Sequence, residues 1–305
     1  MSTPRLGAAL LAIVALAVAD RAEGQACSGA DARCRFGARA AEAALSGAAL
    51  AASGGNPWMG SASTLGYRMA SAPRFAAQGR VVFTGVDVPA SAGDGLAGAT
   101  LVGLGAGVAV SVIDGIAPAA TVGGLGSVDL FAEAGTLLLP DGFEGGSPFT
   151  WSLGARIGVF RESFTLPGIT ASLAYRRIGE LTFDDVNAPA RLAAFNWSDA
   201  SVWSMRAVAG KRLLSLGLTG GLGWDGSSAD ASIGYRTAAG AAATAQENVD
   251  ADRYKAFFNV SWTSLILALS AEAGWQSGPD EHELGVPDPA AGGRFFGGLS
   301  ARLTF

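Results

Sequence analysis

The amino-acid sequence predicts an all-β protein, an antiparallel transmembrane β-barrel of about ten strands (roughly 8 to 14) with a short helical amino-terminal segment. Three observations predict this fold. Apolar and small or polar residues alternate with a period of two through most of the chain after residue 73. Charged residues make up only 15% of the 305 residues, whereas glycine occurs 44 times. The chain also stops on Phe305, inside an amphipathic strand pattern.

The last twelve residues have the pattern of a single strand with two different faces. One face consists of Phe295, Gly297, Leu299, Ala301, Leu303 and Phe305, and the other of Arg294, Phe296, Gly298, Ser300, Arg302 and Thr304. A terminal Phe305 with Leu303 behind it resembles the barrel-closing strand of bacterial outer-membrane β-barrel proteins. This resemblance implies a location in the bacterial outer membrane, contact with outer-membrane lipid and insertion by the barrel-assembly machinery.

Residues 1–26 have the pattern of a secretory signal peptide. A short basic leader ends at Arg5, an apolar run follows, and small residues precede the expected cleavage site after Ala26. Cleavage after Ala19 is an alternative. With the first site, Cys27 becomes the new amino terminus, so a lipid anchor has to be considered, although Gly24-Gln25-Ala26 is a poor lipoprotein signal. We therefore expect an exported protein.

The remaining composition agrees with export. Cys27 and Cys34 are the only cysteines and lie close together, so in an oxidising compartment they can form one disulfide. His282 is the only histidine, and we expect neither a metal site nor a cofactor. The net charge of −5 argues against nucleic acid as a partner.

Residues 27–72 differ from the rest of the chain. Arg35 to Ala52 is rich in alanine and fits a helix, which the Ser53-Gly54-Gly55 sequence should end. An Asn56-Pro57 turn follows. We expect this segment to lie in the periplasm or to plug the lumen. The alanine-rich helix followed by an Asn-Pro turn resembles the inner hatch of the long-chain fatty-acid transporter family.

Residues 73–305 should form the barrel. The alternation predicts ten strands near residues 74–88, 97–112, 121–138, 148–160, 168–183, 200–210, 213–235, 252–262, 265–276 and 294–305. A transmembrane helix over residues 97–113 is the alternative there. The alternating Gly103, Gly105 and Gly107 disfavour that helix.

The connections between these strands alternate in length. The shorter set comprises residues 112–121, 161–167, 211–212 and 263–264, and the mostly longer set comprises residues 89–96, 140–147, 185–199, 237–251 and 277–293. In barrels of this type the short turns face the periplasm and the long loops face outward. An even strand count then places both ends of the barrel domain at the periplasmic side.

Tryptophans on the expected outer face form two aromatic girdles. Four of them fall at the long-loop ends of their strands, and one falls at a short-turn end: Trp151, Trp203, Trp224 and Trp275, and then Trp262. Tryptophan is enriched where a membrane meets water, so these positions support the assigned orientation.

The expected lumen face carries more basic than acidic residues. The basic ones are Arg80, Arg156, Arg176, Arg206, Arg253, Lys255, Arg294 and Arg302, and the acidic ones are Asp129, Glu133, Glu180 and Glu272. An open, net-positive lumen would favour the passage of anions. Alternatively, these residues pair across strands and fill a barrel that is narrow to begin with.

We therefore expect a narrow channel or transporter for small solutes, anionic or amphipathic in character. The alternative is a structural or adhesive outer-membrane barrel with a filled lumen and functional outer loops. An open lumen with unpaired arginines would favour the channel, and complete ion pairing inside would favour the alternative.

An enzyme is the third possibility, and we do not expect one. Barrel enzymes that use acid–base or serine chemistry need a histidine beside another ionisable group. His282 lies in an acidic loop with Asp280, Glu281 and Glu283, a composition typical of solvated surface. We find no nucleophile-elbow motif on a suitable scaffold.

Overall fold

The computed structural model describes residues 27, 32–66, 73–90, 95–117, 123–164, 166–237, 239–278 and 288–305. The expected signal peptide and the loop that contains His282 lie outside these residues. Within them, no helix is both long enough and apolar enough to span a bilayer.

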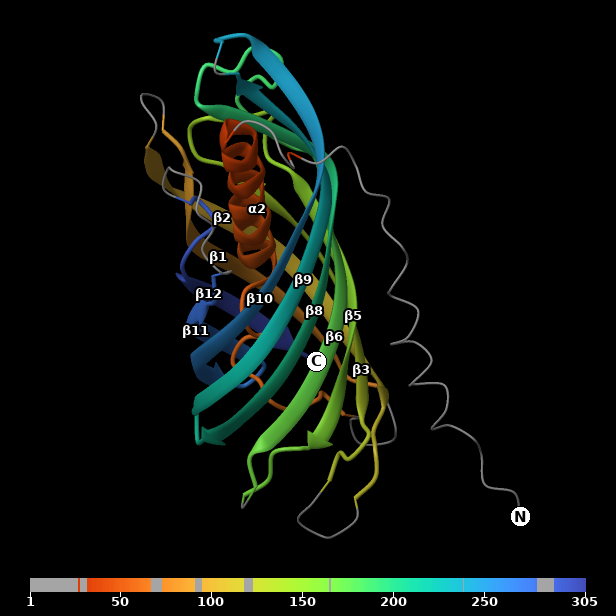
Figure 1. Cartoon of the computed structure of the whole chain (residues 1–305). Helices are drawn as coiled ribbons and strands as arrows, with labels where there is room; N and C mark the ends of the chain where they lie inside the picture. Colours follow the sequence, from red (N-terminus) through yellow and green to blue (C-terminus); the bar gives the residue numbers. More distant parts are fainter. Residues whose placement is uncertain are drawn as a thin grey trace, which may run out of the picture.

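Ten antiparallel strands close into one barrel (Figure 1). They are β1 (Phe75–Pro89), β2 (Leu96–Ile113), β3 (Val128–Leu138), β5 (Phe149–Phe160), β6 (Gly168–Ile178), β8 (Ala193–Leu213), β9 (Leu216–Arg236), β10 (Ala242–Ser264), β11 (Leu267–Gln276) and β12 (Arg294–Thr304). Each strand pairs with two neighbours, and the β8–β9 pairing completes the ring. Two short strands, β4 (Phe143–Glu144) and β7 (Leu181–Phe183), extend the sheet beside β8. The predicted fold class is confirmed.

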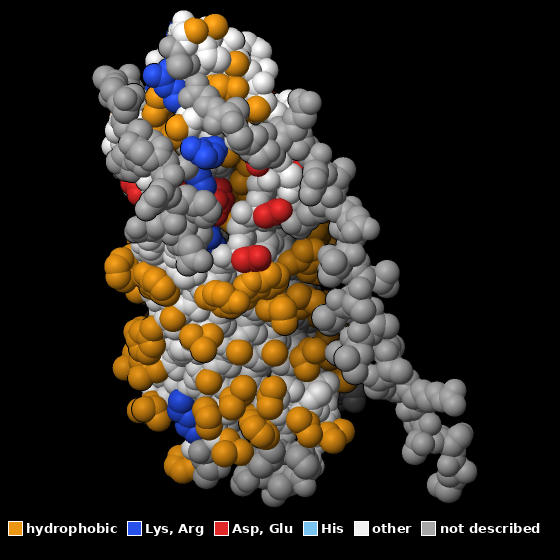
Figure 2. All heavy atoms as spheres, in the orientation of Figure 1, with side chains coloured by type: hydrophobic (Ala, Val, Ile, Leu, Met, Phe, Trp, Pro, Cys, Tyr) orange, Lys and Arg blue, Asp and Glu red, His pale blue; other side chains and the backbone are white. Residues whose placement is uncertain are grey.

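The last strand joins the first, as its alternation predicted. In β12, Leu303 is opposite Ala77 of β1 on one side and Leu267 of β11 on the other. The backbone of Phe305 exchanges hydrogen bonds with that of Phe75, and the two rings stack with centroids 5.1 Å apart. Leu303 and the other alternate residues of β12 face outward. Figure 2 shows that such apolar side chains cover the lower part of the barrel, whereas charged side chains gather mainly above them.

Several strand ends differ from the prediction. The tight turns lie at Leu214-Ser215 and Leu265-Ile266, two or three residues later than expected. Leu214 and Leu265 have positive φ angles of 57° and 52°, which tight hairpin turns require and which leucine seldom adopts. The residue types at these positions therefore gave no sign that a tight turn occurs there.

Two strands, β8 and β10, are also much longer than expected. The segments 185–199 and 237–251 were predicted as loops, but β8 begins at Ala193 and β10 at Ala242. Their upper parts have a polar outer face, so the apolar alternation that identified the other strands is missing. Together with the upper part of β9, they rise beyond the other strands at one end of the barrel (Figure 1). We call this end the upper end, and the end with the two tight turns the lower end.

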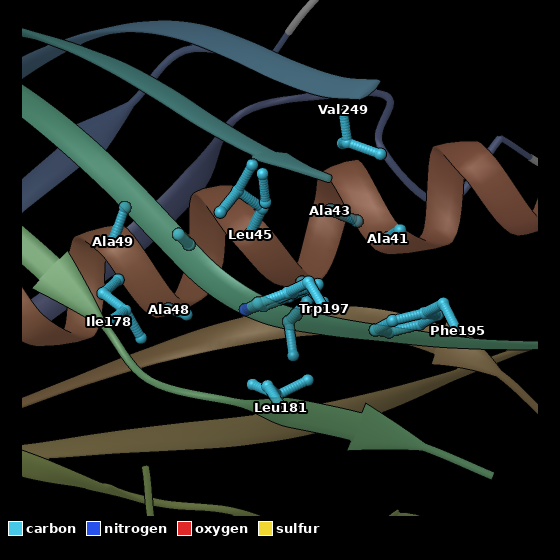
Figure 3. Close-up of a cluster of buried hydrophobic side chains, with 14 of the residues drawn as sticks. Ala41, Ala43, Leu45, Ala48, Ala49, Ile178, Leu181, Phe195, Trp197 and Val249 are labelled. Carbon is cyan, nitrogen blue, oxygen red and sulfur yellow. The ribbon is translucent and has the colours of Figure 1, made fainter. Parts of the chain in front are cut away.

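Inside the barrel lies one helix, α2 (Ala32–Ser53). It packs against β1, β2, β3, β8, β9 and β10, and nearly all of its residues from Cys34 onward are buried. Alanine on several sides lets the helix approach the wall all round, which is the pattern of a helix with no solvent face. Figure 3 shows Leu45 and Ala48 of α2 gathered with Ile178 and Trp197 of the wall.

Glycine makes the closest approach between helix and wall possible. A Cβ added to Gly103 of β2 would lie 2.1 Å from the carbonyl oxygen of Ala51 in α2. At the end of the helix, Gly54 has φ +62° and its amide binds the carbonyl of Leu50. The predicted terminator therefore acts where it was expected.

The chain runs through the lumen from the upper end to the lower end. Near the upper end, Arg33 of α2 donates to the carbonyl of Thr237 in the β9–β10 connection. Near the lower end, the amide of Leu65 donates to Asp129 at the start of β3. We call residues 32–66 the luminal segment. The sequence left the position of this region open, as periplasmic or luminal; in the structure, α2 packs against six strands of the barrel wall.

Candidate functional site

The predicted lumen charges converge on the luminal segment. Nine of the twelve predicted charged residues are buried: Arg80, Asp129, Glu133, Arg156, Arg176, Arg206, Arg253, Lys255 and Glu272. Arg294 and Arg302 are partly buried on the same face of β12. Glu180 is the exception and corrects the prediction. It is exposed in the β6–β7 connection above the lumen, where it accepts a hydrogen bond from Asn196, because β6 ends at Ile178 and the alternation no longer points inward.

The middle of the lumen is organised around Glu133 of β3. Its carboxylate lies 2.9 Å from the guanidinium of Arg80 and 2.6 Å from that of Arg176. Ser152 of the neighbouring strand donates a third bond of 3.0 Å. Two cations therefore share one buried carboxylate, and this pairing joins β1, β3 and β6 across the lumen.

The wall binds the carbonyl end of α2. Arg80 donates to the carbonyls of Ala52 and Ser53 at 2.7 and 2.9 Å. Lys255 donates to Gly54 at 2.9 Å, and Arg206 to Gly55 at 2.8 Å. The last carbonyls of a helix have no partner within it and carry partial negative charge. Cations from three strands therefore satisfy the carboxyl-terminal end of α2.

An acid binds the next part of the same turn. Both oxygens of Glu272 accept main-chain bonds, from Gly55 at 2.7 Å and from Asn56 at 2.9 Å. Asn259 donates to the same carboxylate and accepts from the amide of Gly60. Cations on the carbonyls and a carboxylate on the amides thus hold this turn from opposite sides.

Asp225 of β9 is a lumen residue that the sequence analysis missed. Its carboxylate lies 2.6 Å from Arg206 and 2.5 Å from Lys255, and Ser204 donates to it at 2.8 Å. The inward alternation of this strand, followed for two residues beyond Gly223, would have found it. Asp225 neutralises the two cations that bind the helix end.

The upper part of the helix is held by a second acid that the sequence analysis did not weigh. Glu42 of α2 pairs with Arg253 of β10 at 2.7 Å and with Arg39 of its own helix. Arg39 also pairs with Asp288 at 2.7 Å. Arg294 donates to the carbonyl of Ala43 at 3.0 Å. No pattern in the chain could have shown that Glu42 faces Arg253, because that contact depends on the helix entering the barrel.

The lower part of the luminal segment is held by Asp129. Its carboxylate pairs with Arg156 at 2.7 Å and accepts the amide of Leu65 at 2.9 Å. The hydroxyls of Thr64 and Ser127 are 2.6 Å apart beside it. The luminal segment is therefore bound to the wall at its upper, middle and lower levels.

Below this level, a cavity of about 350 Å³ lies at the lower mouth of the barrel. Residues 60–65 of the luminal segment line it, together with Arg74, Arg212 and Arg302. Arg302 donates to the carbonyl of Met59 at 3.3 Å.

The remaining predicted residues lie as follows. A disulfide joins Cys27 and Cys34 beside the upper end of the lumen, and the amide of Cys27 donates to Glu247 of β10. Trp151, Trp203, Trp262 and Trp275 are exposed on the outer face, and Trp224 is half-buried there. Trp203 and Trp224 are not at strand ends, because β8 and β9 continue above the girdle. Tyr175 links Trp151 and Trp203 into one aromatic row.

Among the described residues, no group of three or more His, Cys, Asp or Glu side chains is placed to hold a metal ion. The chemistry of this site is therefore that of ion pairs and main-chain hydrogen bonds between a barrel wall and its own amino-terminal segment.

No protein-family model matches the chain, and no curated protein matches it. Solved structures with some similarity include the translocator domain of autotransporter NalP from Neisseria meningitidis (12% identity, 76% of this chain and 88% of that chain, TM-score 0.43). The transport unit of the autotransporter AIDA-I from Escherichia coli has 7% identity over 88% of this chain and 99% of that chain, with a TM-score of 0.38. The outer membrane protease OmpT from Escherichia coli has 11% identity over 80% of this chain and 100% of that chain, with a TM-score of 0.35. The similarity of the amino-terminal segment to the fatty-acid transporter family finds no support in these comparisons. The barrel is established by its own strand pairing.

Proposed function

We propose that this protein is an outer-membrane barrel closed to solutes by its own luminal segment, and that it acts through the surface it presents at the upper end. Of the two functions that the sequence left open, this is the structural or adhesive barrel. The observation that carries the proposal is the binding of residues 32–66 to the wall at three levels by charged side chains.

The pairing of the lumen charges supports a luminal segment that stays in the barrel better than it supports an open conduction path. A channel lined by arginines attracts anions when the arginines are free of local partners. Here Arg80, Arg176 and Arg206 are each paired with a carboxylate. Arg80 and Arg206 also donate to carbonyls of the luminal segment. Breaking a buried pair by removing one partner costs about 3–5 kcal/mol. Release of the luminal segment would break the pair between Glu42 and Arg253 and would remove the carbonyl partners of Arg80, Arg206 and Lys255.

The upper end supports a role at the surface. The upper parts of β8, β9 and β10 carry polar and acidic side chains outward, among them Asp199, Asp230 and Asp250. Their inner side packs Phe183, Phe195 and Trp197 into a buried cluster. A polar outer face is stable in water and not in lipid, so the upper parts of β8, β9 and β10 should project beyond the membrane.

Membrane insertion is supported by the outer face below that extension. Exposed leucine, valine and phenylalanine side chains form a continuous apolar surface there (Figure 2), and exposed tryptophans border it. Soluble proteins seldom expose so much contiguous apolar surface, whereas a barrel in lipid requires it. In such barrels the longer end faces outward, so the upper end and the start of α2 would lie at the cell surface.

Single-channel recording from the refolded full-length protein in a planar bilayer tests the proposal. We expect no discrete conductance steps across the range of ordinary membrane potentials. Regular steps with a defined ion preference in the unmodified protein would contradict a closed lumen.

A gated channel is the second candidate, and one observation favours it. The turn at Gly54-Gly55 is held mainly by polar bonds, which can be exchanged for water more readily than apolar packing can. In this case the recordings would show steps only under a condition that weakens ion pairs, such as high salt.

A further inference from the structure

Two of the eight basic lumen residues, Arg294 and Arg302, form no ion pair with a carboxylate among the described residues, and Arg302 is the one that lines a cavity. Six basic residues of the wall pair with a carboxylate at 2.9 Å or less: Arg80, Arg156, Arg176, Arg206, Arg253 and Lys255. Within the described part of the chain, Arg302 forms no ion pair. Its single hydrogen bond goes to the carbonyl of Met59 at 3.3 Å, and its buried Nε has no partner.

The electrostatic surroundings of Arg302 are also cationic. The charged groups that act on it most strongly are Arg156 and Arg212, both of the same sign. A cation withdrawn from water and placed beside other cations is costly unless an anion compensates it. Asp129 does not pair with Arg302: its ion pair is with Arg156, and it also accepts the amide of Leu65.

Arg302 opens into the cavity of about 350 Å³ at the lower mouth. Three glycines line it as well: Gly60 of the luminal segment, and Gly210 and Gly217 of the wall. Since a water molecule occupies about 30 Å³, the space holds a small anion together with several waters. Leu265 and Ile266 of a tight turn also line the cavity, so it lies at the lower end of the barrel.

Two other charged side chains that line the cavity, those of Lys211 and Glu162, are bound to other groups. Lys211 is bound by the carbonyls of Ser163, Phe164 and Leu166. Glu162 is the one acidic side chain among the described lining residues, and it accepts the backbone amide of Arg212. The guanidinium groups of Arg74 and Arg212 form no ion pair within the described chain, so three arginines face one space.

We propose that this cavity binds a small oxyanion of the phosphate type, held by Arg302 with Arg212 and Arg74. A guanidinium presents two parallel N–H donors that match two oxygens of such an anion, and a phosphate carries enough charge for more than one arginine. Residues 60–65 form one wall of the site and β12 another. The bound anion therefore also joins the luminal segment to the barrel.

The test is thermal unfolding of the refolded full-length barrel in a neutral detergent, with inorganic phosphate titrated against chloride at constant ionic strength. Binding to the folded state alone should raise the melting temperature by about 2–5 °C at tenfold saturation. Arg302→Gln should weaken phosphate binding about 10- to 100-fold, because it removes charge-assisted bonds. Arg177→Gln, on an exposed arginine paired with Asp199, is the matched control and should keep the full response.

Phosphorus NMR gives a second measurement that does not depend on how stable each variant is. The phosphate signal should broaden with the unmodified protein and with Arg177→Gln, and stay sharp with Arg302→Gln. A parallel titration with micelles that contain phosphatidylglycerol separates the two sources of the phosphate group. A response to the lipid alone would assign the site to a headgroup, and a response to inorganic phosphate would assign it to a free anion. No response to either, or an equal response in Arg302→Gln, would overturn the proposal.

Discussion

Each lumen carboxylate binds basic side chains, main-chain amides of the luminal segment, or both. Glu272 binds two consecutive amides of the luminal segment, and Asp129 binds both Arg156 and the amide of Leu65. A side chain that binds backbone selects a position of the chain and not a residue type. This explains why small residues such as Gly55 are sufficient at the centre of the site.

Replacing Glu133 by glutamine tests how much its ion pairs with Arg80 and Arg176 contribute to stability. The change leaves Arg80 and Arg176 buried with no opposite charge at that point, so we expect the free energy of unfolding to fall by about 3–5 kcal/mol. Urea unfolding followed by tryptophan fluorescence measures it. Glu180→Gln, which alters an exposed residue, is the control and should change stability by less than about 0.5 kcal/mol. Equal losses in both variants would show that the luminal pairing adds nothing.

Replacing Glu272 by glutamine tests whether its carboxylate fixes the turn at Gly55 and Asn56. A glutamine keeps one acceptor oxygen in place of two, so one of the amides of Gly55 and Asn56 loses its partner at a cost of about 1–3 kcal/mol. We expect amide hydrogen exchange at these two residues to speed up, while the amides of the barrel strands keep their protection. Gln246→Ala, on the exposed face of β10, serves as control. Unchanged exchange at Gly55 and Asn56 would contradict the assigned role.

At the scale of elements, the stability of α2 depends on the barrel wall around it. Most helical stability in proteins comes from tertiary packing and not from helix propensity. Here the packing surface is the inside of the barrel on several sides, with Arg80, Lys255 and Arg206 completing the helix end. The barrel strands are in turn joined across the lumen by those same residues.

Gly103→Ala tests whether helix and wall fit as closely as the structure shows. The added Cβ would lie 2.1 Å from the carbonyl oxygen of Ala51, so either the helix or β2 must move. We expect a lower melting temperature and the appearance of conductance steps in a planar bilayer. Gly79→Ala is the matched control, because a Cβ at Gly79 meets nothing within 4 Å. A silent, fully stable Gly103→Ala variant would show that the luminal segment is not held against β2.

At the scale of the whole molecule, the two ends of the described barrel differ in kind. The upper end has three long strands, a buried aromatic cluster and the start of the luminal segment, whereas the lower end has tight turns and the arginine-lined cavity. Because the chain passes through the lumen before β1 begins, the disulfide at Cys27 and Cys34 lies at the opposite end from the start of the first strand.

Epitope tags test this arrangement in intact bacteria. A tag inserted just before Cys27 should bind antibody on unbroken cells, because the luminal segment carries that end to the upper surface. A tag inserted between Leu214 and Ser215 should bind only after the outer membrane is permeabilised. The opposite result for both tags would reverse the orientation, and exposure of both would mean that the barrel is not inserted as described.

Local pattern in the chain was enough to assign the ten strands, the faces of most of them, the helix with its glycine end and the closing role of Leu303 and Phe305. Each of these depends on residues within a few positions of one another, and the period of two places alternate side chains on opposite faces of a strand. The same reasoning placed eleven of the twelve predicted charges on the inner face and failed at Glu180, where the strand had already ended.

The tertiary structure decided the position and direction of the helix, the upper extensions of β8 and β10, and the partner of each charge. Contacts such as Glu42 with Arg253, or Glu272 with the amide of Gly55, join residues more than 200 positions apart. They exist because the barrel closes around the luminal segment, and closure is a property of all ten strands together. The local alternation that defines each strand carries no information about what fills the space the strands enclose.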